Sequence, residues 1–270
     1  LMSLHFSFTP TAEGGELLGV VTADDDCYRI FGGVGVDAAF VGQVAALGAD
    51  AIEVWSEPNL SPQWKEGEID PVRYVELLRL SYEAIKAANA DTRVISAALA
   101  PTGAQSAFGG DVLWNDNVFY QGMAEAGAAN YADCIGVHYV EGVVAPTVTQ
   151  GDQRDNYPTR YLVPMIQRAA APFRQSSIPV CVTEYGYLSA EGLPYELPEP
   201  FAWASETTLE QQAEWLASGI ETAARLSSVR VEMMIVYQMI GMGEAVHEGY
   251  AIIRSDESCP ACEAIADLRQ

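Results

Sequence analysis

Two glutamates in this chain each follow a short apolar segment and precede a turn. Glu57 comes after segment 51–56, Ala-Ile-Glu-Val-Trp-Ser, and Glu184 comes after segment 178–183, Ile-Pro-Val-Cys-Val-Thr. In a parallel α/β barrel, a carboxylate at the C-terminal end of a strand points into the opening where catalysis occurs. Hydrolysis of a glycosidic bond with retention uses two such carboxyl groups about 5 Å apart. We therefore expect Glu57 and Glu184 to meet at one opening and to act on a glycosidic bond.

The neighbours of the two glutamates favour different protonation states. One carboxyl group must be protonated to donate to the leaving oxygen, and the other must be ionised to attack the anomeric carbon. Glu57 lies between Trp55 and Pro58, and because an apolar environment raises the pKa of a carboxyl group, this suits the acid. Glu184 is followed by Tyr185, whose hydroxyl could stabilise a carboxylate, which suits the nucleophile.

Strand-like and helix-like segments alternate along the chain, which favours a parallel sheet with crossover helices. The strand-like segments are nearly continuous apolar runs, as expected of strands covered on both faces. They are Met2–Phe8, Ala51–Ser56, Arg93–Leu99, Cys134–Tyr139, Pro179–Thr183 and Val231–Tyr237, and Leu17–Val21 is either a further strand or part of a loop. Six βα units predict a (β/α)8 barrel in which two units at the front are absent from this chain. No linker interrupts residues 1–270, so we expect a single domain.

Two of the expected helices carry clear start signals. Asp70 is a suitable N-cap and Pro71 a suitable first residue for one of them. Thr207 and Glu210 match a capping box at the start of another. Residues spaced by three and four predict that the first helix buries Tyr74, Leu77, Leu78, Ser81 and Ile85.

The composition limits the classes of partner. Apolar residues make up 49% of the 270 residues, and no run approaches the roughly 18 consecutive apolar residues of a membrane span. The net charge is −23, from 14 basic and 37 acidic residues. Nucleic acids and anionic membrane surfaces require clustered lysine and arginine. We therefore expect neither of them as a partner, and a neutral or cationic polymer is the easier one to bind.

The cysteines do not form a pattern typical of a metal site. Cys134 and Cys181 lie within apolar segments, and we expect them to be buried and unreactive. Cys259 and Cys262 form a single Cys-x-x-Cys, for which a local disulfide or two free thiols is favoured because zinc sites usually need a second pair of ligands. The sequence does not fix the compartment, although an extracellular or periplasmic location is slightly favoured.

Several segments resemble glycoside hydrolases of clan A. Residues 55–59, Trp-Ser-Glu-Pro-Asn, resemble the Trp-Asn-Glu-Pro-Asn motif at the end of their fourth strand, and residues 183–186, Thr-Glu-Tyr-Gly, are similar to the motif at the end of their seventh. Residues 136–139, Gly-Val-His-Tyr, resemble the sixth-strand segment, and residues 74–86 and 249–265 are similar to family 39-like members. The resemblance implies a retaining hydrolase with a (β/α)8 barrel, a carbohydrate substrate and no cofactor.

The resemblance also assigns roles to individual residues. It implies that Glu57 is the acid/base and Glu184 the nucleophile. The substrate-binding residues that it implies around the cleaved bond are His5, Trp55, Ser56, Asn59, His138, Tyr139, Tyr185 and Tyr237. Further candidates for stacking on sugar rings are Trp64, Trp114, Tyr187 and Trp203.

The chain departs from the family pattern in two respects. Ser56 stands where the family has asparagine, which bonds the sugar 2-hydroxyl, so we expect the rate or the substrate to differ. The match begins at the family's third strand, which implies that an upstream segment or a partner chain completes the barrel, or that the sequence is a fragment. Both departures favour the alternative of a catalytically silent barrel that binds carbohydrate. The identity of the sugar, its linkage and exo or endo action are left open.

Overall fold

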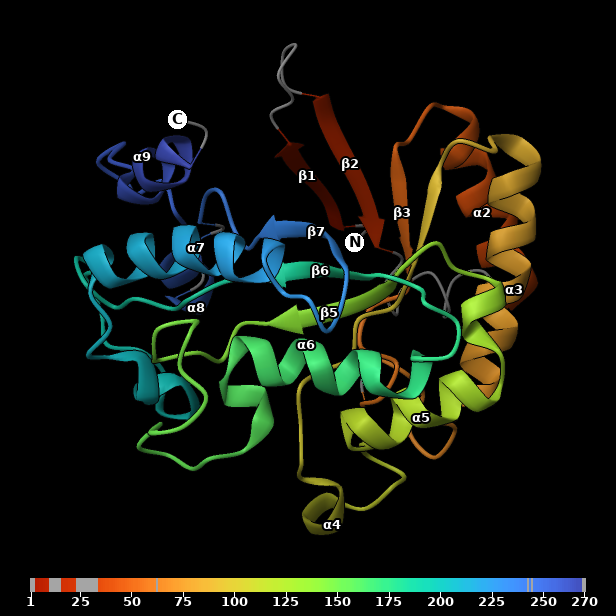
Figure 1. Cartoon of the computed structure of the whole chain (residues 1–270), viewed down its shortest axis with the longest axis horizontal. Coiled ribbons are helices and arrows are strands. Elements are labelled where there is room, and N and C mark those ends of the chain that lie inside the picture. Colours follow the sequence, from red (N-terminus) through yellow and green to blue (C-terminus); the bar gives the residue numbers. More distant parts are fainter. Residues whose placement is uncertain are drawn as a thin grey trace. The chain divides into compact units, whose positions relative to one another are not determined.

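The chain folds into two compact units. The computed structural model describes residues 3–9, 16–22, 34–61, 63–241, 243 and 245–268, with side chains from residue 38 onward except at residue 245. Unit 1 comprises Leu1–Val137 and Ala169–Cys181, and unit 2 comprises His138–Arg168 and Val182–Gln270 (Figure 1). The expectation that residues 1–270 form a single domain stays a prediction.

Unit 1 is built on short parallel strands. β3 (Ala51–Val54) pairs in parallel with β4 (Arg93–Ser96). The next strand is β5 (Ile135–Tyr139), and Cys134, directly before it, forms a parallel bridge with Ile95 of β4. All four residues of β3 are buried, as expected of a strand that is covered on both faces.

Helices connect these strands, as the alternating pattern predicts. α3 (Pro71–Ala88) connects β3 to β4, and α5 (Asp116–Glu125) connects β4 to β5. α2 (Val34–Ala46) precedes β3 and lies against α3 (Figure 1). The two helices approach closely at Gly42, where an added Cβ would lie 3.3 Å from Cβ of Ala84.

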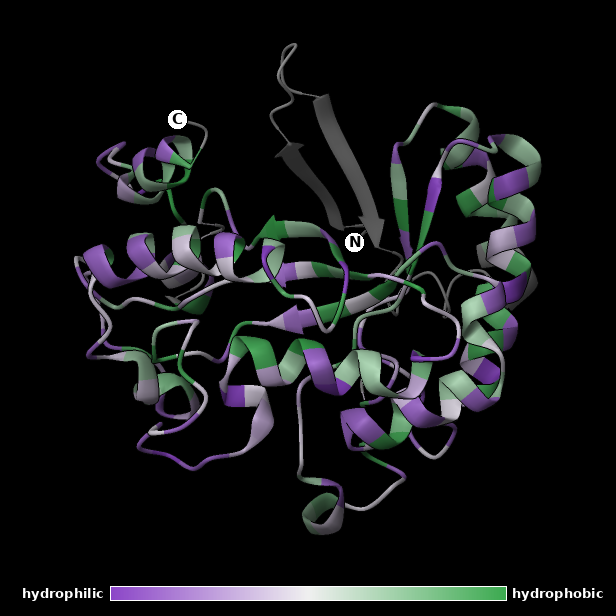
Figure 2. Cartoon of the chain, viewed as in Figure 1, coloured by the Kyte–Doolittle hydropathy of each residue, from purple (hydrophilic) through white to green (hydrophobic). Residues whose placement is uncertain are grey.

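The start of α3 is as predicted. Asp70 is its N-cap and accepts a hydrogen bond from the N–H of Val72 at 2.8 Å, and Pro71 is the first helical residue. Figure 2 shows hydrophilic and hydrophobic residues alternating along this helix, as expected when one face is buried. The predicted face is confirmed, because the buried residues of α3 include Tyr74, Leu77, Leu78, Ser81 and Ile85.

The first two strands are not parallel, which corrects the expectation for the N-terminal segment. β1 (Ser3–Thr9) and β2 (Glu16–Thr22) pair in antiparallel fashion, with His5 opposite Val20. Only six residues separate them, whereas parallel neighbours need a crossover of about a dozen residues or more. Of the two alternatives that the sequence left open for Leu17–Val21, the structure shows the strand.

The sheet that extends into unit 2 has the strand order β5, β6 (Val180–Tyr185), β7 (Val231–Val236). The N–H of Ile135 donates to the carbonyl of Pro179 at 2.9 Å, and the N–H of Gly186 donates to that of Tyr139 at 3.0 Å. From the first of these bonds to the second, the residue numbers rise along both strands, so β5 and β6 are parallel. The connecting helices are α6 (Leu162–Ala170) and α7 (Leu209–Ala224).

The capping box of α7 lies one residue later than predicted. Thr208, not Thr207, is the N-cap, and its side chain accepts from the N–H of Gln211 at 3.1 Å while the Gln211 side chain accepts from the N–H of Thr208 at 3.0 Å. Thr207 is buried, and its carbonyl accepts the hydroxyl of Ser189 at 2.7 Å. That contact holds Thr207 outside the helix, so the next threonine takes the cap position.

The remaining elements are short. Residues 249–265, which are similar to family 39-like members, begin at the end of α8 (Ala245–Tyr250), and Ile253 forms an isolated parallel bridge with Ile240. The other helices are α4 (Gln105–Phe108), α9 (Pro260–Asp267), η1 (Ala128–Asn130), η2 (Pro158–Arg160), η3 (Ala171–Phe173) and η4 (Glu199–Ala204).

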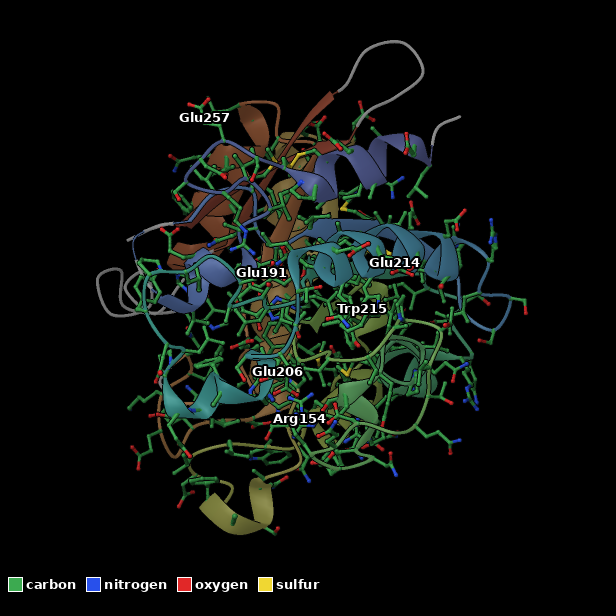
Figure 3. All side chains as sticks on the ribbon, turned by 90° about the vertical axis from the view of Figure 1, so that its left-hand side faces the viewer. Arg154, Glu191, Glu206, Glu214, Trp215 and Glu257 are labelled. Atoms are coloured by element: carbon green, nitrogen blue, oxygen red, sulfur yellow. A yellow bond between two sulfur atoms is a disulfide. The ribbon has the colours of Figure 1, made fainter. Side chains whose placement is uncertain are left out.

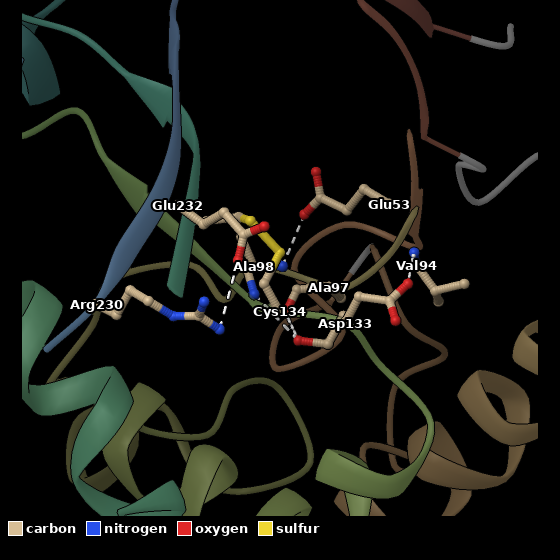
Figure 4. Close-up of a disulfide and its surroundings, with 11 residues drawn as sticks. Glu53, Val94, Ala97, Ala98, Asp133, Cys134, Arg230 and Glu232 are labelled. Carbon is tan, nitrogen blue, oxygen red and sulfur yellow. Dashed lines mark hydrogen bonds and ion pairs between the residues drawn. A yellow bond between two sulfur atoms is a disulfide. The ribbon is translucent and has the colours of Figure 1, made fainter. Parts of the chain in front are cut away.

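Four of the cysteines form two disulfides. Cys134 and Cys181 are buried, as predicted, and are joined to each other with their Cα atoms 5.8 Å apart (Figure 4). Cys259 and Cys262 form a local disulfide at the start of α9, where Cys259 is the N-cap. The local pair was one of two alternatives left open by the sequence. The buried pair was missed, because it depends on the register of β5 and β6.

The acidic composition is visible on the surface of unit 2. Glu191, Glu206, Glu214 and Glu257 are all exposed (Figure 3). Among the helices that the structure describes, none combines the length and the apolar character needed to cross a membrane.

Candidate active site

Glu57 lies in a constrained turn three residues beyond β3. Its N–H donates to the carbonyl of Ala98 at 2.9 Å, and its carbonyl accepts the N–H of Leu60 at 3.2 Å. Both Trp55 and Glu57 have left-handed backbone conformations, with φ of 73° and 51°. Residues other than glycine rarely adopt this conformation unless the surrounding structure imposes it. The half-buried side chain of Glu57 therefore starts from a backbone that has little freedom.

Trp55 and Asn59 anchor this turn within unit 1. The buried indole of Trp55 donates to the carbonyl of Gln63 at 2.9 Å and meets the ring of Trp64 edge to face, with centroids 5.5 Å apart. The buried side-chain amide of Asn59 accepts the N–H of Ala100 at 2.9 Å. The same amide donates to the carbonyls of Ala100 and Trp114, both at 3.0 Å. Their contacts to substrate stay predictions, and in this structure both side chains bind the protein.

Glu184 is the second-last residue of β6, and its side chain is 25% exposed. Its Oε2 lies 3.6 Å from Nδ1 of His138, a buried residue of the neighbouring strand β5. The structure thus brings together, within unit 2, two residues predicted from separate motifs. A His138 that carries a proton on Nδ1 would attract a carboxylate at Glu184, as an ion pair when the ring is charged and through the N–H dipole when it is neutral.

Tyr139 and Tyr185 are buried beneath this strand end. Their rings stack with centroids 6.3 Å apart, and the ring of Tyr187 meets both of them edge to face. The hydroxyl of Tyr139 donates to the carbonyl of Arg160 at 3.1 Å, and that of Tyr185 donates to the carbonyl of Trp215 at 2.6 Å. Burial raises the pKa of all three tyrosines, so their hydroxyls are neutral.

Tyr250 is a neighbour of Glu184 that the sequence analysis missed as a site residue. Its hydroxyl donates to the carbonyl of Val140 at 2.5 Å, and its ring lies 5.4 Å from that of Tyr237. Burial raises the pKa of Tyr250 most strongly, and the negative charges of Glu141 and Glu184 raise it further. The similarity of residues 249–265 to family 39-like members did not single out Tyr250, because its proximity to Glu184 depends on how the segment after β7 folds back.

A polar cluster follows β5 in unit 2. Arg160 pairs with Glu141 and, at 3.3 Å, with Asp155, and Arg154 pairs with Asp152 at 2.7 Å. Burial raises the pKa of Glu141, and the two arginines offset part of this effect. The guanidinium of Arg154 also lies 4.4 Å from the ring centroid of Trp203, so it covers one face of that candidate stacking residue.

The other predicted site residues lie as follows. His5 is on β1, and its side chain falls outside the described part of the chain. Ser56 is half-buried beside Glu57 in unit 1, and Tyr237 is half-buried in unit 2. Trp64 is buried and Trp114 is half-buried, both in unit 1. Among the described residues, no three histidine, cysteine, aspartate or glutamate side chains gather in a way that could hold a metal ion.

Several solved structures with a similar fold are glycoside hydrolases. A family 39 glycoside hydrolase from Bacteroides cellulosilyticus WH2 is 21% identical with a TM-score of 0.57, and the match covers 87% of this chain and 44% of that one. A family 128 (subgroup II) endo-β-1,3-glucanase from Sorangium cellulosum is 18% identical with a TM-score of 0.57, covering 89% of this chain and 82% of that one. A family 39 enzyme from Xanthomonas axonopodis pv. citri is 18% identical with a TM-score of 0.54, covering 87% and 44%.

These similarities concern the fold. The chain spans less than half the length of the two family 39 structures. No protein-family model and no curated protein matches the sequence. The expected likeness to glycoside hydrolases is thereby confirmed as a likeness of fold, an α/β structure with parallel strands.

Proposed function

We propose that this chain is a retaining glycoside hydrolase that acts on a polysaccharide or oligosaccharide. Glu57 would be the acid/base and Glu184 the nucleophile. The observation that carries the proposal is Glu184 itself: a partly exposed carboxyl group at the C-terminal end of a parallel strand, 3.6 Å from Nδ1 of His138, in a fold similar to glycoside hydrolases. The βα units would belong to one (β/α)8-type domain.

The chemistry of the proposal has two steps. In the first, Glu57 donates its proton to the leaving oxygen while the carboxylate of Glu184 attacks the anomeric carbon and forms a glycosyl-enzyme ester. In the second, Glu57 takes a proton from water, which attacks the same carbon and releases Glu184. Both displacements invert the centre, so the product retains the configuration of the substrate. A His138 with a proton on Nδ1 would attract the carboxylate form of Glu184 that the attack needs.

The first experiment is a panel of substrates. Aryl glycosides of common sugars would be tested together with β-1,3-glucan, since one structure of similar fold is a β-1,3-glucanase. NMR of the first-formed sugar reports its anomeric configuration. Retention supports the proposal, whereas inversion would require carboxyl groups about 6.5–9.5 Å apart and would overturn the mechanism.

The second experiment assigns the two roles. Glu184→Ala should abolish turnover. Glu57→Ala should keep activity only on substrates with activated leaving groups, and azide should accelerate it by replacing the water that Glu57 activates. Glu214→Ala removes an exposed glutamate from α7 and serves as the matched control, with no expected effect. Equal and modest losses in the Glu57 and Glu184 variants would count against these roles.

The alternative is a barrel that binds carbohydrate without cleaving it. The observation that favours it is Ser56, which stands beside the proposed acid/base and in place of the family's asparagine. Affinity electrophoresis in gels that contain each polysaccharide would separate the two functions. Retarded migration together with no hydrolysis of any substrate would support the binding function.

A further inference from the structure

The four residues that follow β4 are held by side chains. In the segment 97–100, each N–H donates to a buried side chain of unit 1, where a neighbouring strand would normally supply a carbonyl. The four acceptors, in order from residue 97, are Tyr74 at 2.5 Å, Glu53 at 2.8 Å, Tyr120 at 3.4 Å and Asn59 at 2.9 Å. The position of this segment therefore depends on those side chains.

One of these residues connects directly to the proposed acid/base. Ala98 donates its N–H to Oε1 of Glu53 at 2.8 Å and accepts the N–H of Glu57 with its carbonyl at 2.9 Å. Figure 4 shows the carboxyl group of Glu53 directed at the Ala98 nitrogen. A single residue thus joins the side chain of Glu53 to the backbone of Glu57.

The identity of Glu53 is unexpected for its place in the fold. It lies in β3 between Ile52 and Val54, all three are buried, and Glu53 itself is only 2% exposed. Burying a carboxyl group is unfavourable unless it is hydrogen-bonded, and an apolar residue would fill a buried strand position at lower cost. The presence of a glutamate at this buried position is explained if the hydrogen bond that it accepts from Ala98 serves the function of the site.

Glu57 also needs such support. Its φ of 51° is left-handed, as is that of Trp55 at 73°, and strained backbone of this kind persists only where the surroundings over-determine it. The N–H of Glu57 is bound to Ala98, so a shift of Ala98 would move the start of the Glu57 side chain. Small displacements of a catalytic group lower rates strongly.

We propose that Glu53 is a positioning residue, which acts through Ala98 to hold the backbone of Glu57 and so aims the carboxyl group of Glu57. The inference rests on the proposed role of Glu57 as acid/base. Glu53 itself contacts no substrate in this scheme. Its nearby charge also helps to raise the pKa of Tyr74 and Tyr120 after burial, so those hydroxyls stay neutral partners of the same segment.

Four variants separate positioning from stability. Glu53→Gln keeps an acceptor oxygen for Ala98, whereas Glu53→Met keeps the length of the side chain without it. Glu53→Asp keeps the charge but is too short to reach Ala98, so it replaces the methionine variant should that one fail to fold. Tyr120→Phe is the matched control. It removes the hydrogen bond that Tyr120 accepts from the N–H of Leu99, the residue next to Ala98, whereas the backbone of Glu57 is bonded to Ala98.

The first readout is the dependence of kcat/KM on the leaving group. An aryl glycoside with a poor leaving group needs proton donation, and a dinitrophenyl glycoside does not. Glu53→Met should lose about 10- to 100-fold on the poor leaving group and less than about 3-fold on the activated one. Glu53→Gln should behave like the wild type, and Tyr120→Phe should change both substrates equally. Equal losses of Glu53→Met on both substrates would overturn the proposal.

The second readout does not depend on activity. Hydrogen exchange at the Glu57 amide should accelerate at least about tenfold in Glu53→Met and Glu53→Asp, while core amides of α3 stay protected. An unchanged exchange rate at Glu57 would refute the link through Ala98. Should the wild type cleave none of the glycosides, the proposed function fails, and this exchange rate alone decides whether Glu53 holds the Glu57 backbone.

Discussion

The buried disulfide offers a quantitative test of the structure. Cys134 and Cys181 are both fully buried and 47 residues apart in sequence, whereas Cys259 and Cys262 are three residues apart. A disulfide removes conformational entropy from the unfolded chain, and the effect grows with the length of the loop that it closes. The resulting stabilisation is about 4 kcal/mol for the buried pair and about 1.6 kcal/mol for the local pair. Cys134→Ala/Cys181→Ala should therefore lose more than twice the stability that Cys259→Ala/Cys262→Ala loses.

Urea unfolding, followed by tryptophan fluorescence and circular dichroism, measures this difference. The two double variants form a matched pair, since each replaces two cysteines and removes one disulfide. The buried pair also loses the packing of two sulfur atoms in the core, which adds to its deficit. A loss for the buried pair that is equal to or smaller than the loss for the local pair would refute the reasoning.

Thiol labelling under native conditions gives a second check on the same feature. A reductant should open the disulfide between Cys259 and Cys262 first, because Cys262 is exposed. Cys134 and Cys181 should react only when urea opens the strands around them. Mass spectrometry of alkylated peptides distinguishes the two pairs. Simultaneous labelling of both pairs without urea would show that the sheet does not protect the buried sulfur atoms.

Three further predictions concern the strand ends. Gly219→Ala would place a Cβ 1.7 Å from the hydroxyl oxygen of Tyr185 and should lower the free energy of unfolding in urea by about 1–3 kcal/mol. Gly110→Ala, whose Cβ would have its nearest atoms at 3.5 Å, should leave stability unchanged. Equal effects of the two substitutions would contradict the packing of α7 on β6. Burial raises the pKa of Asp152, but its arginine partner outweighs burial and holds that pKa below its ordinary value. This stabilisation is present above the unfolded-state pKa and is lost as the pH falls through the folded-state pKa, so Asp152→Asn should lower Tm more at pH 7 than near pH 2, and an equal loss would argue against it. Ser56→Asn should raise kcat/KM on a glycoside with an equatorial 2-hydroxyl by several-fold and leave its 2-deoxy analogue unchanged; no difference between the substrates would show that residue 56 does not reach that hydroxyl.

The elements that the sequence predicted best are those with local signals. Asp70 and Pro71 mark the start of α3 because the cap and the first turn involve only adjacent residues. The predicted N-cap of α7 was off by one residue because the sequence offers two adjacent threonines, Thr207 and Thr208, that can cap. Which of them does so depends on Ser189, which holds Thr207 by a hydrogen bond from a distant loop. Contacts between distant segments are invisible to a local pattern.

Strand direction shows the same limit. The sequence predicted a strand at Met2–Phe8 and left Leu17–Val21 open as a strand or a loop, but a run of apolar residues carries no information about the direction of its neighbour. The short connection was the available signal for an antiparallel pair. The disulfide between Cys134 and Cys181 was missed for a related reason, because two cysteines 47 residues apart become neighbours only when β5 and β6 are in register.

The candidate site illustrates which catalytic features a sequence can reveal. Glu57 and Glu184 stand out because each interrupts the end of an apolar run, where a carboxyl group has solvent within reach. Glu53 interrupts the middle of such a run, and the pattern gave no reason to single it out. The proposed role of Glu53 follows from its hydrogen bond to the N–H of Ala98, and the alanine side chain has no functional group that a sequence pattern could reveal. A residue that acts through the backbone of another is therefore found only by tracing hydrogen bonds, and buried charges inside strands are the places to begin.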